Sequence, residues 1–406
     1  MRHHLYRRIS AVALALTMLL GACGQLAQVA QGQARRQPPA TNQKKNKRPD
    51  GQTDKNETPT DVVGKPQEAE TISVSTSLVN IEAAVYHKKT GQVMAGLKKE
   101  NFAIFEDGVQ RDISNFATPE APLTVAMVVE YSKLTEQLGG DYNDPGRYEF
   151  LRPMAMFLTQ FVHPPEDYVS VIAFDIRPTP ITDFTNDPRR IQQTIDLMLK
   201  NYPAFREVNL YDALKFTLIG GRGDSVVLDN SKSATSDYAG LVDIQGRRKA
   251  IILIASGLDT FSKINYDKAR KIAQNSGVPI YIIGTLKFFQ KKYGDQIGAN
   301  DDLMGNPGRM SFLQAENALK TFAKETGGAY YPVTFEGELP SVLGSINALL
   351  RSQYSLAFNP GEQKRDGKQH KILVKVDVDG DGQYDDKEFI VQHRPFYNSP
   401  KDEVKK

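Results

Sequence analysis

The chain has 406 residues, of which 51 are lysine or arginine and 48 are aspartate or glutamate. Three of the basic residues, Arg2, Arg7 and Arg8, lie in an N-terminal segment with the features of a cleaved signal. Without them the chain has 48 basic and 48 acidic residues. Such a neutral mature chain has no excess of positive charge for the nucleic-acid backbone, so we expect no nucleic-acid partner.

Cys23 is the only cysteine, and it ends the signal-like segment. An apolar stretch from Ile9 to Leu20 follows the basic residues, and it is shorter than the roughly 20 residues of a membrane-spanning helix. The segment resembles a bacterial lipoprotein signal, which implies removal of residues 1–22 and acylation of Cys23. The alternatives are an ordinary signal peptide and a buried thiol. With one cysteine, the exported domains cannot form an internal disulfide.

Residues 23–70 are predicted to be a disordered tether, because they contain almost no large apolar side chains. Their basic run from Arg35 to Arg48 is interpreted as a solvated spacer, with contact to anionic lipid or glycan as the alternative. Gly24 stands where an aspartate would favour the inner membrane in Gram-negative lipoproteins. The resemblance therefore implies an exported protein anchored by its lipid to the outer membrane, on its periplasmic face or at the cell surface.

The folded part is predicted to be an α/β domain inserted between two β-strand flanks. Residues 71–120 and 351–398 alternate with period two between Thr-Gly and Asp-Gly turns, which indicates antiparallel strands that together form one β-sandwich. Residues 121–350 alternate short apolar runs with helix-periodic segments, which is typical of a doubly wound, mostly parallel sheet. Two stretches, 220–248 and 287–307, are predicted to be loops, and residues 399–406 a disordered tail.

Several segments resemble a von Willebrand factor A domain, in particular the bacterial branch common in Acidobacteria. They are residues 97–108, Leu210-Tyr-Asp-Ala-Leu214, Gly327-Gly-Ala-Tyr-Tyr331 and Arg351-Ser-Gln-Tyr354. The resemblance spans roughly residues 73 to 398 and implies a Rossmann-like fold with ligands bound beyond the carboxyl ends of the strands.

The adhesion metal site of that family is degenerate in this sequence. Glu130 stands at the first aspartate and Ser132 is retained, but other ligand positions hold Leu134, Val208 and Ser256. Hydrocarbon cannot coordinate a hard cation, so Mg²⁺ held by Glu130, Ser132 and Asp259 is the weaker expectation. Partner binding without that ion is favoured.

A second candidate metal site has the spacing of an EF-hand calcium loop over residues 377–388. Its six ligand positions hold Asp377, Asp379, Asp381, Gln383 through its backbone carbonyl, Asp385 and Glu388. The flanking segments look like strands and not helices, so a hairpin clamped by Ca²⁺ is favoured over a plain acidic turn.

The sequence shows no catalytic constellation. The segment Gly221-Arg-Gly-Asp-Ser225 reproduces an integrin-recognition sequence, but this sequence arises easily in polar loops. None of the histidines lies in a recognisable nucleophile or metal motif. We therefore expect a non-enzymatic, lipid-anchored adhesion-type module that binds a protein or surface polymer and is stabilised by Ca²⁺. A scaffold of an envelope or secretion complex is the alternative, and an envelope hydrolase is the third.

Overall fold

The computed structural model describes residues 78–133, 146–161, 163, 166–200, 205–223, 236–301, 307–360 and 366–399. The chain divides into two compact units, residues 1–69 and 70–406, and all described residues belong to the second. Cys23 and the predicted tether therefore lie outside the described residues. In the part of the chain that the structure describes, no helix combines the length and the hydrophobicity needed to span a bilayer.

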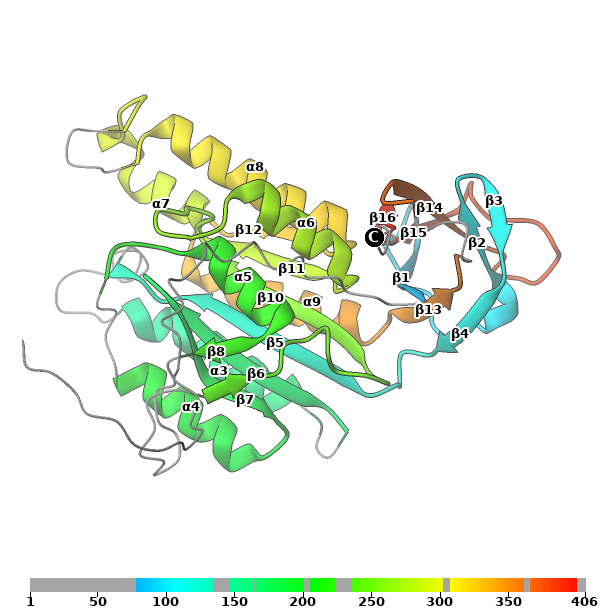
Figure 1. Ribbon diagram of the computed structural model, residues 1–406, viewed down its shortest axis with the longest axis horizontal. Coiled ribbons are helices and arrows are strands. Elements are labelled where there is room, and N and C mark those ends of the chain that lie inside the picture. Colours follow the sequence, from blue (N-terminus) through cyan, green and yellow to red (C-terminus); the bar gives the residue numbers. More distant parts are fainter. Residues whose placement is uncertain are drawn as a thin grey trace, which may run out of the picture. The chain divides into compact units, whose positions relative to one another are not determined.

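A six-stranded sheet forms the centre of the α/β domain (Figure 1). Its spatial order is β12-β11-β10-β5-β6-β7, with all neighbours parallel except β7, which runs antiparallel to β6. The strands are β5 (Leu123–Glu130), β6 (Tyr168–Phe174), β7 (Pro178–Thr185), β10 (Arg248–Ala255), β11 (Ile280–Gly284) and β12 (Tyr330–Pro332). The chain order reverses between β5 and β10, which makes this the switch point of a doubly wound sheet.

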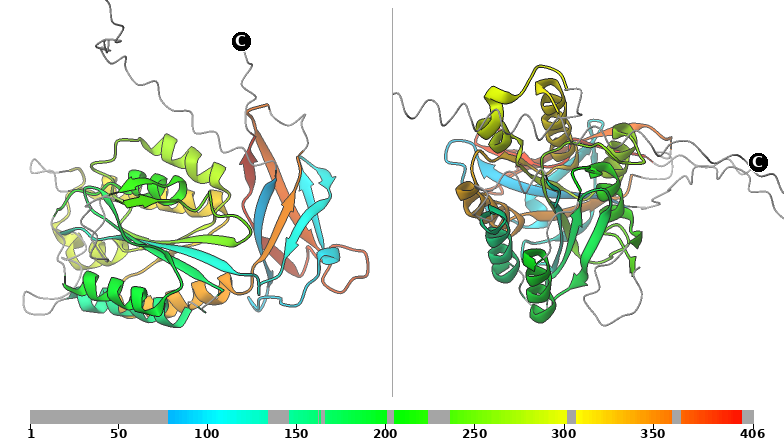
Figure 2. Two further views of the ribbon diagram at one scale, coloured as in Figure 1. Left: turned by 60° about the horizontal axis from the view of Figure 1, so that its bottom comes forward. Right: turned by 90° about the vertical axis from the view of Figure 1, so that its left-hand side faces the viewer.

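Helices cover both faces of this sheet, as Figure 2 shows. Alternate residues of β5 point to opposite faces: Met127 belongs to the core that includes residues of α3, α4 and α9, while Val128 belongs to the core that includes residues of α5, α6 and α8. The helices are α3 (Gly146–Phe161), α4 (Pro188–Lys200), α5 (Leu210–Ile219), α6 (Tyr266–Ser276), α7 (Leu286–Tyr293), α8 (Arg309–Thr326) and α9 (Leu339–Leu350). Burial on both faces explains why the strands are continuous apolar runs.

The two flanks form one β-sandwich, as predicted. One sheet has the order β15-β1-β13-β4 and the other the order β16-β14-β2-β3, so each sheet takes strands from both flanks. The strands are β1 (Val79–His87), β2 (Phe102–Glu106), β3 (Val109–Arg111), β4 (Ile113–Ala117), β13 (Tyr354–Phe358), β14 (Gln369–Val376), β15 (Phe389–Gln392) and β16 (Phe396–Asn398). Ile81, Ile104 and Leu356 lie in their common core and are fully buried.

Both stretches that were predicted to be loops contain short elements of regular structure. The segment 220–248 contains the small hairpin of β8 (Gly221–Gly223) and β9 (Ser236–Tyr238). The segment 287–307 begins inside α7, because Leu286 and Phe289 pack against Phe312 of α8 and so give that stretch a buried helical face. Three single turns of 3₁₀ helix cover Lys99–Asn101, Gly294–Gln296 and Glu336–Glu338.

Arg248, at the start of β10, holds the sandwich to the α/β domain. Its guanidinium donates to the carbonyl of Pro119 at 2.8 Å, to the carbonyl of Leu350 at 2.5 Å and to Oε2 of Glu82 at 3.5 Å. Pro119 and Leu350 lie where the chain enters and leaves the α/β domain. The sandwich thus contacts the amino end of the sheet, which leaves the carboxyl edge for other contacts.

Candidate functional site

Three loops meet at the carboxyl edge of the sheet, beside the switch point. These carboxyl-edge loops, residues 131–133, 205–209 and 256–263, are joined by backbone hydrogen bonds. The amide of Lys133 donates to the carbonyl of Phe205 at 2.8 Å, and the amides of Thr260 and Phe261 donate to the carbonyl of Val208 at 2.8 and 3.0 Å. The amide of Val208 donates in turn to Oγ1 of Thr260 at 2.9 Å. The middle loop is thereby fixed between the other two.

Glu130 lies beneath these loops, at the last position of β5. Its Oε2 accepts hydrogen bonds from the amide of Ser256 at 2.6 Å and from the hydroxyl of Ser256 at 2.7 Å. Its Oε1 accepts a third hydrogen bond, from the hydroxyl of Ser132 at 3.1 Å. Burial raises the pKa of the Glu130 carboxyl above its ordinary value, while these hydrogen bonds act in the opposite direction.

The structure therefore brings Glu130 and Ser132 together, as the sequence predicts, and adds Ser256 to them. None of the three is more than 2% exposed. A cation would have to displace hydrogen bonds inside a closed cluster, which is unfavourable for an ion that keeps several waters in its shell. The cluster thus acts chemically as a bridge between the ends of β5 and β10.

Asp259 lies in the same loop as Ser256 but points to helix α5, whose first turn it caps. Its Oδ1 accepts hydrogen bonds from the amide of Tyr211 at 3.2 Å and from the hydroxyl of Ser262 at 2.5 Å. The Ser262 hydroxyl oxygen accepts from the amides of Tyr211 and Asp212, both at 3.1 Å. These contacts satisfy amides at the first turn of α5 that have no partner inside the helix. A role of Asp259 as a metal ligand stays a prediction.

Three residues of this edge were not predicted from the sequence. Asn209 precedes α5, and its amide group donates to the carbonyl of Ile176 at 3.0 Å. Asp212 accepts from the amide of Lys263 at 2.9 Å, and Ser262 contributes the cap described above. An acid in the first turn of a helix is a usable signal for Asp212. Ser262 offered none, because its partner Tyr211 is 51 residues away in the chain.

The surface of the carboxyl-edge loops is aromatic on both sides. The side chain of Phe205 is 44% exposed and that of Phe261 is 53% exposed. The backbone hydrogen bonds of the loops place Phe205 beside Lys133 and Phe261 beside Val208. Val208 itself is buried, and its hydrocarbon side chain belongs to the core.

The acidic loop of residues 377–388 joins β14 to β15. Strands flank it as predicted, but they do not pair with each other: β14 pairs with β2 and β16, whereas β15 pairs with β1. The predicted hairpin is therefore wrong, and the loop crosses from one sheet of the sandwich to the other. Asp-Gly turn signals are local and do not determine which sheet the following strand joins.

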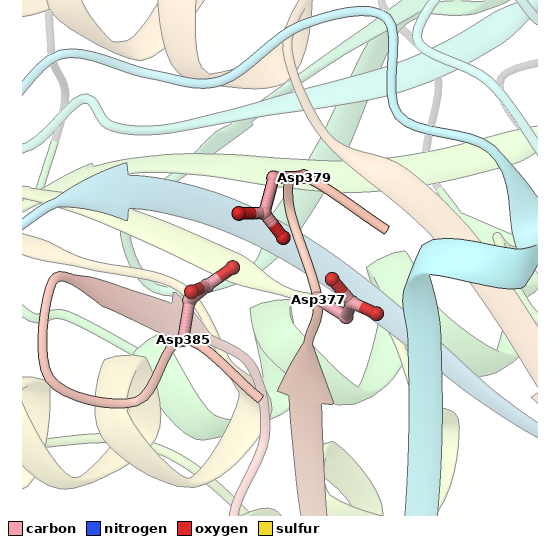
Figure 3. A group of neighbouring side chains, drawn as sticks. All are labelled: Asp377, Asp379 and Asp385. Atoms are coloured by element: carbon pink, nitrogen blue, oxygen red, sulfur yellow. The ribbon is translucent and has the colours of Figure 1, made fainter. Parts of the chain in front are cut away.

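Asp377, Asp379 and Asp385 come together in this loop, as Figure 3 shows. One carboxylate oxygen of each lies within 4.8 Å of those of the other two. The oxygens of Asp377 also accept from the amides of Gly380 and Gly382, at 2.7 and 2.8 Å. These glycines have φ angles of 78° and 87°, a backbone conformation that residues with a Cβ atom disfavour. The three residues hold positions one, three and nine of the predicted calcium loop.

The other predicted ligands lie outside this group of three. Oδ1 of Asp381 accepts from the amide of Gln383 at 2.7 Å, and the carbonyl of Glu388 accepts from the amide of Lys88 at 2.7 Å. Three carboxylates at this spacing fit a hard cation that prefers oxygen ligands. Coordination by Asp381, Gln383 and Glu388 stays a prediction.

No protein-family model matches the sequence, and no curated protein matches it. Several solved structures are similar to this chain. Proximal thread matrix protein 1 from the mussel byssus is 15% identical with a TM-score of 0.38, over 60% of this chain and 50% of the mussel chain. The vWF domain of the type V pili tip protein Mfa5 from Porphyromonas gingivalis is 13% identical with a TM-score of 0.37, over 57% and 95%. BatB from Bacteroides thetaiotaomicron is 14% identical with a TM-score of 0.35, over 57% and 100%.

This chain thus spans half the length of the mussel protein. At these TM-scores the matches support no inference about ligand or partner. The fold class follows from the chain's own strand order and two helical layers: it is an α/β, doubly wound domain inserted into a β-sandwich.

Proposed function

We propose that this chain is a lipid-anchored envelope protein whose inserted α/β domain binds a protein or surface polymer through the carboxyl-edge loops, without catalysis. The observation that supports this best is the pair of exposed rings of Phe205 and Phe261 on loops that are fixed by hydrogen bonds between them. Exposed aromatic side chains on a positioned loop are characteristic of interaction sites. The carboxyl edge at a switch point is also where such sheets bind ligands.

Binding is favoured over catalysis by the environment of the acid at this edge. Glu130 is enclosed by Ser132 and Ser256 and fully buried, so its oxygens do not reach a substrate on the surface. A general acid or base must come within hydrogen-bond reach of the group it serves. We therefore do not propose the envelope hydrolase.

A scaffold of an envelope complex is the second candidate, and the contacts of Arg248 favour it. One buried guanidinium bonds to both connections between the domains and to Glu82 of the sandwich, so the two domains are joined at this point. A scaffold of this kind would hold its partners through other surfaces. Its partners would then be insensitive to changes at Phe205 and Phe261.

The proposal includes Ca²⁺ in the loop of residues 377–388, supported by the grouping of Asp377, Asp379 and Asp385. At a crossing between sheets, such an ion would stabilise the sandwich and supply no chemistry to a substrate. We do not extend the proposal to Mg²⁺ at Glu130, because its oxygens already accept three hydrogen bonds in a closed cluster. Acylation of Cys23 would attach the protein to the outer membrane.

A photo-crosslinking experiment separates the two candidates. The full chain is expressed in its native envelope with p-benzoylphenylalanine in place of Phe261, or in place of Met156 as a matched exposed apolar control on α3. Binding at the carboxyl edge predicts a discrete crosslinked product from position 261 and none from position 156. Equal products from both positions, or none from position 261 while partners still co-purify, would contradict the binding proposal and support the scaffold.

A further inference from the structure

Three acidic side chains of the carboxyl edge are turned inward and engaged, whereas Glu207 is exposed. Glu130 accepts from Ser132 and Ser256, Asp259 caps α5, and Asp212 accepts from the amides of Lys263 and Ile264. Their negative charge is directed at backbone amides and hydroxyls inside the loops. The charge that an approaching partner meets is therefore set by other residues.

Basic side chains dominate the exposed surface of the same loops. Among the described residues of the carboxyl-edge loops, the exposed charged side chains are Lys133, Arg206 and Lys263 against Glu207. Neither Lys133 nor Lys263 forms an ion pair within the described part of the chain. Positive charge is thus exposed at the switch point of the sheet.

The lysines lie next to the exposed rings. The amide of Lys133 donates to the carbonyl of Phe205, which makes these two residues neighbours across two loops. Lys263 is two residues after Phe261 on the third loop, and its amide is held by Asp212 at 2.9 Å. Each side of the middle loop therefore presents one aromatic ring and one ammonium group. A partner that uses both must combine negative charge with apolar side chains.

We propose that the carboxyl-edge loops bind an acidic peptide segment that carries aromatic or branched apolar side chains, and that they do so without a metal ion. This inference rests on the proposed function and names the chemistry of its partner. Charge complementarity favours the acidic segment, because the exposed side chains of Lys133 and Lys263 give this edge a positive potential. The two rings favour a peptide over an acidic polysaccharide, since a peptide supplies apolar side chains to pack against them.

The test selects binding peptides with the full chain in detergent and EDTA, from a displayed library of random dodecapeptides. The expected winners combine aspartate or glutamate with phenylalanine, leucine or isoleucine. Their affinity, measured by fluorescence polarisation, should fall severalfold as NaCl rises from about 50 to 300 mM, because salt screens exposed charges. Selection of basic or purely apolar peptides, or no selection above background, would overturn the inference.

Variants assign the binding to the named side chains. The double variant Lys133→Glu with Lys263→Glu should weaken the selected peptides by about tenfold or more, since two attractive contacts become repulsive. Phe205→Ser with Phe261→Ser should weaken them similarly. Lys271→Glu on α6 and Met156→Ser on α3 are exposed matched controls and should leave affinity unchanged. Equal losses in the controls, or no loss in the charge reversal, would contradict the assignment.

The failure of this inference can be told apart from that of the proposed function. If position 261 crosslinks to an envelope partner but no acidic peptide competes for it, the binding function stands and its acidic partner is refuted. If polygalacturonate competes and the peptides do not, the ligand is an acidic polymer and the inference is equally refuted. Competition by the selected peptides, lost in the charge reversal, supports it.

Discussion

Ser256 donates two hydrogen bonds, from its amide and its hydroxyl, to a single carboxylate oxygen of Glu130, at 2.6 and 2.7 Å. The contact joins the end of β5 to the end of β10, the two strands at the switch point of the sheet. It is a bridge made only of protein groups. Its energetics can be measured without any ligand.

The first prediction concerns the pH dependence of this bridge. Burial raises the pKa of Glu130 in the folded chain, so the folded state favours the protonated form, and that advantage is lost as the pH rises through the raised pKa. Wild type should therefore lose stability relative to Glu130→Gln as the pH rises from about 4 to 8. Urea unfolding of both proteins across this range measures the difference.

Glu120 provides a comparison, because its pKa is shifted in the opposite direction to that of Glu130. Its exposed carboxyl accepts a hydrogen bond from Thr118, which lowers its pKa. Relative to Glu120→Gln, wild type should gain stability as the pH rises. A difference for Glu130 that has the same sign as the one for Glu120 would show that the three hydrogen bonds to Glu130 outweigh its burial.

The second prediction concerns calcium. With weak affinity typical of exported modules, about 10⁻⁴ to 10⁻³ M, about 10 mM Ca²⁺ should stabilise the chain by about 1.4 to 2.7 kcal/mol. The melting temperature should rise by several degrees, as read by calorimetry in Ca²⁺ and in EGTA. Asp379→Asn with Asp385→Asn should abolish the shift, and Asp377→Ala with Glu388→Ala should do so too.

Asp386 supplies the control for that measurement. It lies in the same loop but outside the predicted ligand positions, and its carboxylate pairs with Lys375 at 2.6 Å. Asp386→Asn should therefore retain the calcium shift. An identical melt of the wild type in Ca²⁺ and in EGTA would reject the calcium site.

The third prediction concerns Arg248. Replacing it by methionine leaves Glu82 buried without its guanidinium, and burial already raises the pKa of that carboxyl. Breaking one side of a buried ion pair costs about 3 to 5 kcal/mol. Urea unfolding should show this loss for Arg248→Met and a smaller loss for Arg248→Met with Glu82→Gln. Equal losses would place the effect of Arg248 in its bonds to the two carbonyls alone.

The fourth prediction separates capping from metal binding at Asp259. Asp259→Ala should cost about 0.5 to 2 kcal/mol and speed hydrogen exchange at the amide of Tyr211, because that amide at the N-terminus of α5 loses one of its two acceptors. Asp259→Asn keeps an acceptor oxygen and should have a small effect. A large effect of Asp259→Asn that appears only when Mg²⁺ is present would instead identify Asp259 as a metal ligand.

Strands with strong local patterns could be predicted from the sequence. The apolar runs at Thr124–Val129 and Ala250–Ala255 became β5 and β10, because burial on both faces requires such runs. Edge strand β7 was missed, since its prolines at 178 and 180 argue against a strand, and only an edge position next to β6 tolerates them. Helix α7 was missed because its apolar face is satisfied by a distant helix.

The candidate sites, too, could be predicted only where their residues are close together in the sequence. The spacing of Asp377, Asp379 and Asp385 was sufficient to predict their proximity, because all three belong to one short loop. The role of Asp259 was not, since its partner Tyr211 belongs to a helix 48 residues earlier. The crossing of the acidic loop between sheets depends on the pairing of β15 with β1, which local turn residues do not encode.

The two bonds from Arg248 to Pro119 and Leu350 also have a mechanical consequence. A partner that pulls on the carboxyl edge while the other end of the protein is held would load both crossings of the chain at once, since they lie at one guanidinium. Strands loaded side by side share the force, whereas strands loaded in series do not. The inserted domain is therefore attached through two connections that share the load, which suits a protein under tension.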